Sequence, residues 1–142
     1  VLMPNHFHFL LKQIKDHGVS KFVSQFTNSY TRYFNTKYSR PGSLFQGPFK
    51  AVCVESEEQL IHLSRYIHLN PYVSSVIRKS ELPTYPWSSF PDYLKESSTL
   101  VDPTPILSYF KSGSDYQTFV LNHSDYAKEL EVVKHLTLDL DH

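Results

Sequence analysis

The stretch SEEQLIHLSRYIHLNP (residues 56–71) predicts a helix whose start and end are both marked in the sequence. Ser56 followed three residues later by Gln59 is typical of a capping box, in which two side chains bond the free backbone amides of the first helical turn. We expect the helix to cover residues 57–69, because Asn70 precedes a proline and is therefore disfavoured in the helical region.

One face of this helix carries polar side chains at four-residue spacing: His62, Tyr66 and Asn70. Residues four apart lie one helical turn above each other, so Tyr66 and Asn70 face the same neighbour. A half-buried core tyrosine near a helix end fits the same spacing. The helix alone therefore leaves a structural and a functional interpretation open.

Other segments show regular patterns as well. Apolar residues recur at three- and four-residue spacing between residues 19 and 38, which predicts an amphipathic helix. Residues 5–11 and 49–55 are short apolar runs bounded by turn formers, which favours strands. The proline-rich residues 83–91 predict an irregular loop. Weaker helical patterns follow at residues 106–111, 116–121 and 126–136.

The first of these runs contains two histidines at alternate positions, His6 and His8. On a strand they project to the same side, with Cα atoms about 6.5 to 7 Å apart. Two imidazoles so placed are able to share one metal ion, but ordinary packed or surface histidines fit the spacing equally well.

The composition is that of one globular domain. The chain has 142 residues, 40% of them hydrophobic and 15% aromatic, which excludes disordered and collagen-like classes. Its apolar runs fall far short of the ~20 residues that a membrane-spanning helix needs. Because Cys53 is the single cysteine and no signal-peptide pattern opens the chain, we expect a cytoplasmic protein.

The formal net charge of zero conceals a strong asymmetry along the chain. Residues 1–50 carry a net charge of +6, whereas residues 91–142 carry −5. We expect the first third of the chain to meet an anionic partner, and the last third to form a solvated tail or an electrostatic cover.

Several separated motifs occur together in a recognisable order. They are MPNHFH (residues 3–8), YFN and KY (33–35 and 37–38), GSLFQG and FK (42–47 and 49–50), RYIHLNP (65–71) and WSSF (87–90). In this combination the chain resembles the single-tyrosine HUH transposases, specifically the REP-associated tyrosine transposases of bacteria. The resemblance covers residues 1–94, and residues 95–142 are expected to form an acidic, mostly helical C-terminal extension.

The resemblance implies an α+β fold, a ferredoxin-like antiparallel sheet with helices packed on one face. Family members usually have a strand and a helix before the MPNH segment, and this chain begins at that segment. We therefore expect a sheet that is truncated at its N-terminal side. Since an unpaired strand edge recruits a partner, we also expect a homodimer.

Carried over residue by residue, the resemblance implies that His6, His8 and Asn70 are metal ligands and that Tyr66 is the nucleophile. The implied activity is the nicking and transfer of single-stranded DNA through a 5′-phosphotyrosine, next to hairpin-forming repeats. Imidazole and amide ligands suit Mg²⁺ or Mn²⁺, although the spacing does not exclude zinc.

Two other histidines lie on the same helix. His62 shares the stripe of Tyr66 and stays a secondary candidate, whereas His68 lies about 200° around the helix from Tyr66 and is not expected to be a ligand.

The cationic first third supplies the expected contacts to DNA phosphates. The candidate residues are Lys12, Arg32, Lys37, Arg40 and Lys50. The aromatic residues Tyr30, Tyr33, Phe34 and Tyr38 suit base stacking, but we expect most of them to lie in the core. The resemblance implies a protein of the bacterial cytoplasm that associates with the nucleoid when bound to DNA.

Two alternatives remain open from the sequence. The first is a catalytically inactive module of the same fold that binds DNA hairpins. The second is a metal-dependent hydrolase that uses water and needs the histidine pair but not Tyr66.

Overall fold

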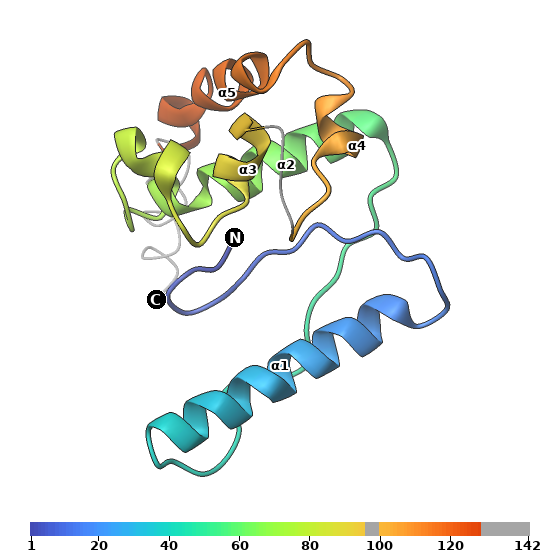
Figure 1. The fold of residues 1–142 in the computed structure, drawn as a ribbon, viewed down its shortest axis with the longest axis vertical. Coiled ribbons are helices and arrows are strands. Elements are labelled where there is room, and N and C mark those ends of the chain that lie inside the picture. Colours follow the sequence, from blue (N-terminus) through green and yellow to red (C-terminus); the bar gives the residue numbers. More distant parts are fainter. Residues whose placement is uncertain (96–99, 129–142) are drawn as a thin grey trace, which may run out of the picture. The chain divides into compact units, whose positions relative to one another are not determined.

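Helices make up the regular structure of the protein, which is described by a computed structural model for residues 1–95 and 100–128 (Figure 1). In chain order they are α1 (Gly18–Lys37), α2 (Glu57–Val73), the 3-10 helix η1 (Lys79–Thr84), α3 (Phe90–Lys95), α4 (Thr104–Leu107) and α5 (Gly113–Leu121). The chain divides into two compact units. The first, called the helical unit, combines Val1–Phe9 with the chain from Val54 onward, and the second, the α1 unit, is Leu10–Cys53.

The expected antiparallel sheet is wrong, because residues 1–95 and 100–128 contain no strand. The pairing found there is an isolated antiparallel bridge between Leu2 and Phe7. A strand needs a ladder of backbone hydrogen bonds to a neighbouring strand. The two apolar runs at residues 5–11 and 49–55 contain no such ladder. Their composition indicated extended backbone without specifying a partner for it.

Residues 5–9 of the expected first strand, which was to cover residues 5–11, belong instead to a short hairpin at residues 1–9, which we call the histidine hairpin. Val1 and His8 exchange two backbone hydrogen bonds of 2.9 and 3.0 Å, and the Met3 amide donates to the His6 carbonyl at 2.8 Å. A proline and an asparagine between Met3 and His6 make the turn. The hairpin thus satisfies locally the backbone groups that the expected sheet would have paired.

α2 begins as predicted but ends four residues later. The Ser56 hydroxyl accepts from the Gln59 amide at 3.1 Å, while the Gln59 side chain accepts from the amide of Glu55 at 2.8 Å, one residue before the cap. The predicted end at residue 69 is wrong, because the helix continues through Pro71 to Val73. Pro71 is fully buried, so packing of this last turn outweighs the local preference of a residue before proline.

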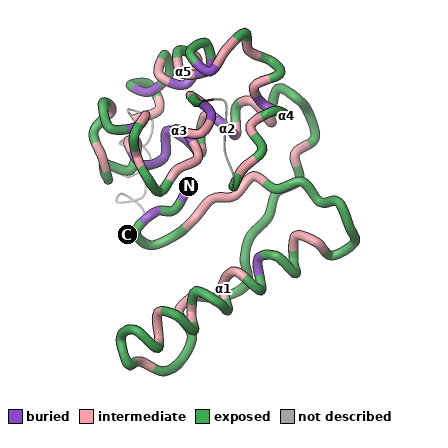
Figure 2. Tube along the Cα trace, viewed as in Figure 1, coloured by how far each residue is buried: buried purple, intermediate pink, exposed green. Residues whose placement is uncertain are grey.

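The core of the helical unit lies where α2, α3 and α5 meet (Figure 2). Its fully buried side chains include Phe90 of α3, Tyr116 and Val120 of α5, and Leu82 of η1. The helices approach closely because Gly113 begins α5: a Cβ atom on it would lie 2.7 Å from the carbonyl oxygen of Tyr93. η1 and α3 cover only the two ends of the region that was expected to be an irregular loop, residues 83–84 and 90–91, and residues 85–89 between them are irregular, so that prediction is wrong at its ends alone.

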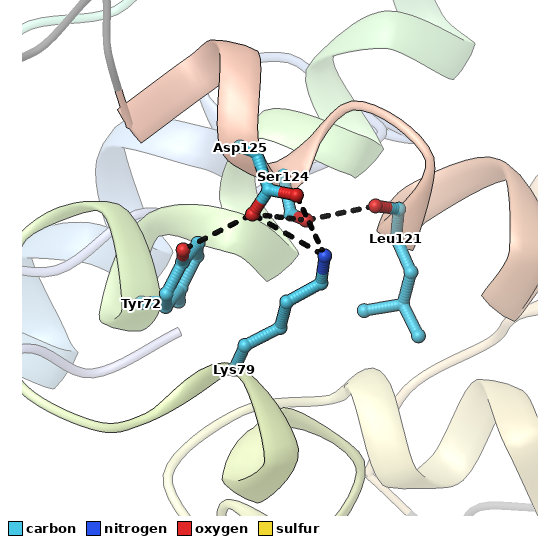
Figure 3. Close-up of polar contacts among 5 residues, drawn as sticks. All are labelled: Tyr72, Lys79, Leu121, Ser124 and Asp125. Carbon is cyan, nitrogen blue, oxygen red and sulfur yellow. Dashed lines mark hydrogen bonds and ion pairs between the residues drawn. The ribbon is translucent and has the colours of Figure 1, made fainter.

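The segment after α5 is tied to α2 and η1 by polar contacts (Figure 3). The Asp125 carboxylate accepts from the Lys79 ammonium at 3.1 and 3.3 Å and from the Tyr72 hydroxyl at 3.3 Å. The Lys128 ammonium lies 4.4 Å from the centroid of the Tyr72 ring. α4 and α5 overlap the predicted helical patterns at residues 106–111 and 116–121, whereas most of the pattern at 126–136 lies outside the described residues.

The α1 unit confirms the predicted helix at residues 19–38 almost to the residue. All of its residues are described, and Val23 is the one buried side chain among them. The expectation that most of its aromatic residues lie in a core is therefore wrong. Tyr30, Tyr33 and Tyr38 are 45%, 58% and 57% exposed.

Candidate active site

The histidine hairpin presents its two imidazoles from one face. Residues that pair across an antiparallel hairpin share a face, so His8 lies on the side of Val1 and His6 on the side of Met3. Val1 and Met3 are buried, whereas Leu2 on the opposite face is exposed. The centroids of the His6 and His8 rings are 4.9 Å apart, and the rings are nearly perpendicular at 84°.

Tyr66 of α2 contacts one member of this imidazole pair, His8. The centroids of the Tyr66 and His8 rings are 5.7 Å apart in an edge-to-face arrangement. Half of the Tyr66 surface is exposed, so its side chain is accessible to a macromolecule from outside. The structure therefore brings together two segments that lie almost 60 residues apart in the sequence.

The hydrogen bonds of the two imidazoles leave nitrogen lone pairs available. Nδ1 of His6 lies 2.6 Å from Oδ1 of Asn5, and an amide oxygen only accepts, so Nδ1 is the donor, and in the neutral form of the ring Nε2 carries the lone pair. Nε2 of His8 is buried and has no hydrogen-bond partner among the residues that the structure describes. Burial lowers the pKa of His8, and the nearby His6 lowers it further. A neutral imidazole with a free lone pair is the form that binds metal ions.

Asn70 is placed one helical turn beyond Tyr66 but makes a different contact. Its side chain is buried, and Oδ1 accepts from the Ser74 hydroxyl at 3.4 Å. No hydrogen bond joins Asn70 to His6 or His8 in the described part of the chain. A role as third ligand stays a prediction. In the same residues, no group of three or more His, Cys, Asp or Glu side chains is placed to hold a metal ion.

His62, the secondary candidate, lies among charged side chains of its own helix. Its Nδ1 accepts from Arg65 at 2.9 Å, and its Nε2 lies 3.8 Å from the Glu58 carboxylate. These contacts do not link it to the histidine hairpin.

His68 faces the core, as the helical geometry predicts. Nδ1 lies 2.7 Å from the Tyr116 hydroxyl and Nε2 lies 2.9 Å from the Ser89 hydroxyl, so both nitrogens are occupied. Complete burial lowers the pKa of His68 to about 3. His68 is thus a neutral structural residue and not a ligand.

The cationic candidates for DNA contacts all belong to the α1 unit. Lys12, Arg32, Lys37 and Lys50 are exposed, and Arg40 is half-buried. The Lys37 ammonium donates to the Tyr33 hydroxyl at 3.2 Å and lies over the ring of Tyr38 at 5.6 Å. The Arg40 guanidinium donates to the Asn35 side chain at 3.0 Å and to a backbone carbonyl, so part of its hydrogen-bonding capacity is already used.

Sequence reasoning missed two contributors to the site. The first is Asn5, which lies inside the quoted MPNHFH motif. Its position next to His6 was the available signal, because the hairpin turn brings the Asn5 side chain onto the His6 ring. Ser89 lies inside the quoted WSSF motif, but its contact with His68 spans 21 residues and no local pattern indicates it.

Comparison with known proteins supplies the family. Residues 1–70 match the family model described as "Transposase IS200 like", a stretch that contains the histidine hairpin, Tyr66 and Asn70. Over these residues the chain belongs to the IS200-like transposases. Membership of this transposase family makes it a DNA-processing protein. Searches of curated proteins and of solved structures found no match. Among the described residues of this IS200-like transposase, no helix is both long and apolar enough to span a membrane.

Proposed function

We propose that this transposase nicks single-stranded DNA and transfers the cut strand through a covalent bond between Tyr66 and a 5′ phosphate. The observation that supports this most strongly is the contact between the Tyr66 and His8 rings, with the unpartnered Nε2 of His8 beside it. A half-exposed phenol next to lone-pair nitrogens is suited to act on a phosphodiester that approaches from solvent.

His6 and His8 are the residues that would hold a divalent ion, Mg²⁺ or Mn²⁺, with Asn70 as a proposed third ligand. The donor set fits such an ion because both imidazoles have a lone pair to offer, and Asn5 fixes the ring of His6 as outer-shell partners do at metal sites. When bound, the ion would neutralise charge that develops on the phosphate and orient the phosphate for in-line attack.

Tyr66 performs the covalent step. Its phenolic oxygen bonds to phosphorus while the bond from phosphorus to the 3′ oxygen breaks, and the phenol proton passes to solvent as the leaving 3′ oxygen gains one. The products are a 5′-phosphotyrosine and a free 3′ hydroxyl. Because the phosphotyrosine bond preserves the phosphodiester's energy, a second 3′ hydroxyl reverses the reaction and joins a different strand.

The α1 unit supplies the proposed DNA contacts. Its cations give an electrostatic affinity that does not depend on sequence, and the exposed Tyr33 and Tyr38 beside Lys37 suit stacking on unpaired bases. Hairpin-forming repeat DNA is the proposed substrate, in the bacterial cytoplasm at the nucleoid.

A homodimer is also part of the proposal, on a different basis from the expected sheet edge. The α1 unit has one buried side chain, and its exposed Ile14 and Tyr30 favour association with another surface. Light scattering of the free protein tests this, and a strict monomer would contradict it.

Incubation with end-labelled hairpin DNA and Mn²⁺, followed by a denaturing gel, tests the activity. We expect a covalent adduct that a chelator and Tyr66→Phe both abolish. Tyr126→Phe, which also alters an exposed tyrosine of the helical unit, is the matched control and should keep the adduct. Tight binding without adduct would favour the inactive hairpin-binding module. The observation that favours this alternative is that Oδ1 of Asn70, the proposed third ligand, accepts a hydrogen bond from Ser74. Nicking that survives Tyr66→Phe would favour a hydrolase that uses water.

A further inference from the structure

A chain of buried hydrogen bonds crosses the helical unit behind Tyr66. It links Ser89 to His68, His68 to Tyr116, and Tyr116 to the hydroxyl of Ser64 at 3.0 Å. His68, Tyr116 and Ser64 are each 2% exposed or less. Neither His68 nor the WSSF motif has a role in the chemistry proposed above.

The directions of these bonds follow from their last member. The Ser64 hydroxyl donates to the Ile61 carbonyl at 2.7 Å, so Ser64 accepts from the Tyr116 hydroxyl. The Tyr116 oxygen then accepts from Nδ1–H of His68, and Nε2 of His68 accepts from the Ser89 hydroxyl. Each donor has one acceptor, and a single neutral tautomer of His68 satisfies the whole chain.

His68 fixes how α2 is rotated about its axis. It lies about 200° around the helix from Tyr66, so a residue clamped on the core side determines where Tyr66 is aimed on the other side. The clamp is polar and directional at both ring nitrogens, which specifies an orientation more narrowly than apolar packing does.

The segment that clamps His68 also holds the histidine hairpin. The Trp87 carbonyl accepts from the Leu2 amide at 2.7 Å, and the Tyr85 hydroxyl donates to the Leu2 carbonyl at 3.4 Å. Residues 85–89 therefore touch the hairpin through Trp87 and α2 through Ser89, two residues further on. We call residues 85–89 the bridge segment.

We propose that Ser89 is a positioning residue: through the bridge segment it sets the Tyr66-bearing helix against the histidine hairpin. Ser89 touches neither the imidazole pair nor Tyr66, and it acts through His68. The inference deepens the proposed function, and rests on it, because it assigns the alignment of the nucleophile with the imidazoles to one hydroxyl.

Ser89→Ala tests this in the full chain, with Ser80→Ala, an exposed serine of η1, as the matched control. At saturating DNA and Mn²⁺, Ser89→Ala should slow adduct formation by at least about tenfold, since small misplacements of reacting groups are costly. Its Kd for hairpin DNA should stay within about twofold of wild type, because the proposed DNA contacts lie in the other unit. Ser80→Ala should change neither quantity.

A second pair of variants isolates the hydroxyl from the shape of the side chain. Ser89→Thr and Ser89→Val have nearly the same volume, and only threonine keeps the donor to His68. We expect Ser89→Thr to react at least fivefold faster than Ser89→Val, with near-ultraviolet circular dichroism showing that both are folded. Equal rates for the two variants would overturn the proposal, as would a wild-type rate in Ser89→Ala.

A measurement without DNA separates this proposal from the proposed function. A nuclear Overhauser effect between the Tyr66 ring and the His8 ring reports their contact directly. It should weaken in Ser89→Ala and persist in Ser80→Ala. Absence of any adduct with wild type refutes the proposed function alone, and the ring contact then decides the positioning role: an unchanged effect in Ser89→Ala overturns it.

Discussion

Acidification should destabilise the protein through His68. The imidazole is fully buried, and burial lowers its pKa from the ordinary 6.5 to about 3. Between these two values the unfolded chain binds the proton and the folded protein does not, so the free energy of unfolding falls as the pH falls. The stabilisation from a neutral His68 is complete above pH 6.5 and is lost progressively toward pH 3.

The magnitude follows from the size of the pKa difference. Each unit between the two pKa values is worth about 1.4 kcal/mol, so lowering the pH from 7.5 to 5 should cost about 2 kcal/mol from His68 alone. His8, whose pKa is also lowered by burial, adds to the loss with the same sign.

Urea unfolding at several pH values between 7.5 and 5 measures this loss. In His68→Gln the histidine's part of the pH dependence should disappear, whatever the variant's absolute stability. His123→Gln, which replaces an exposed histidine, should keep the wild-type dependence. A wild-type dependence in His68→Gln, or an NMR titration in which the His68 ring protonates near pH 6.5, would refute the reasoning.

Three further outcomes are expected. Gly113→Ala should lower the free energy of unfolding by about 1 to 3 kcal/mol in urea titrations, because the new Cβ atom would lie 2.7 Å from a backbone oxygen. Gly18→Ala is the control and should not destabilise the protein, because its Cβ atom would lie 3.8 Å from the nearest neighbouring atom. Equal stabilities of the two variants would disprove the close approach at Gly113. Tyr116→Phe should cost about 1 to 3 kcal/mol by leaving Nδ1 of His68 unpaired, and an unchanged unfolding midpoint would contradict the buried chain. Asp125→Asn should lower the melting temperature slightly at low salt and less at high salt, because salt screens the ion pair between this exposed carboxylate and the Lys79 ammonium. The same ammonium holds the pKa of Asp125 below its usual value. An effect that does not depend on salt would count against the ion pair.

Local patterns in the sequence predicted α1 and the start of α2. The side-chain cap at Ser56 and the apolar spacing of α1 are determined within a few neighbouring residues, so both could be predicted, although the Gln59 side chain bonds the amide of Glu55 and not that of the cap. The end of α2 was not, because burial of Pro71 against other helices overrides a local preference. The sheet failed for a related reason: an apolar run indicates extended backbone, but whether it finds a partner depends on residues far away in the chain.

At the candidate site, too, the local contacts could be predicted from the sequence and the long-range contacts could not. Alternation in a short extended run was enough to place His6 beside His8, and helical spacing was enough to turn His68 away from Tyr66. The contact between His8 and Tyr66 was expected from the resemblance to a family and not from spacing. The link from Ser89 to His68 had no sequence signal, because neither residue type implies a partner 21 positions away.

Mapping the covalent DNA adduct to one residue tests the central claim most directly. After reaction with hairpin DNA and Mn²⁺, the protein is digested and the DNA-linked peptide is identified by mass spectrometry. We predict a 5′-phosphonucleotide on Tyr66, absent when His8 is replaced by alanine in a variant that still binds the DNA. A nucleotide on another tyrosine, or an undiminished yield in His8→Ala, would contradict the account.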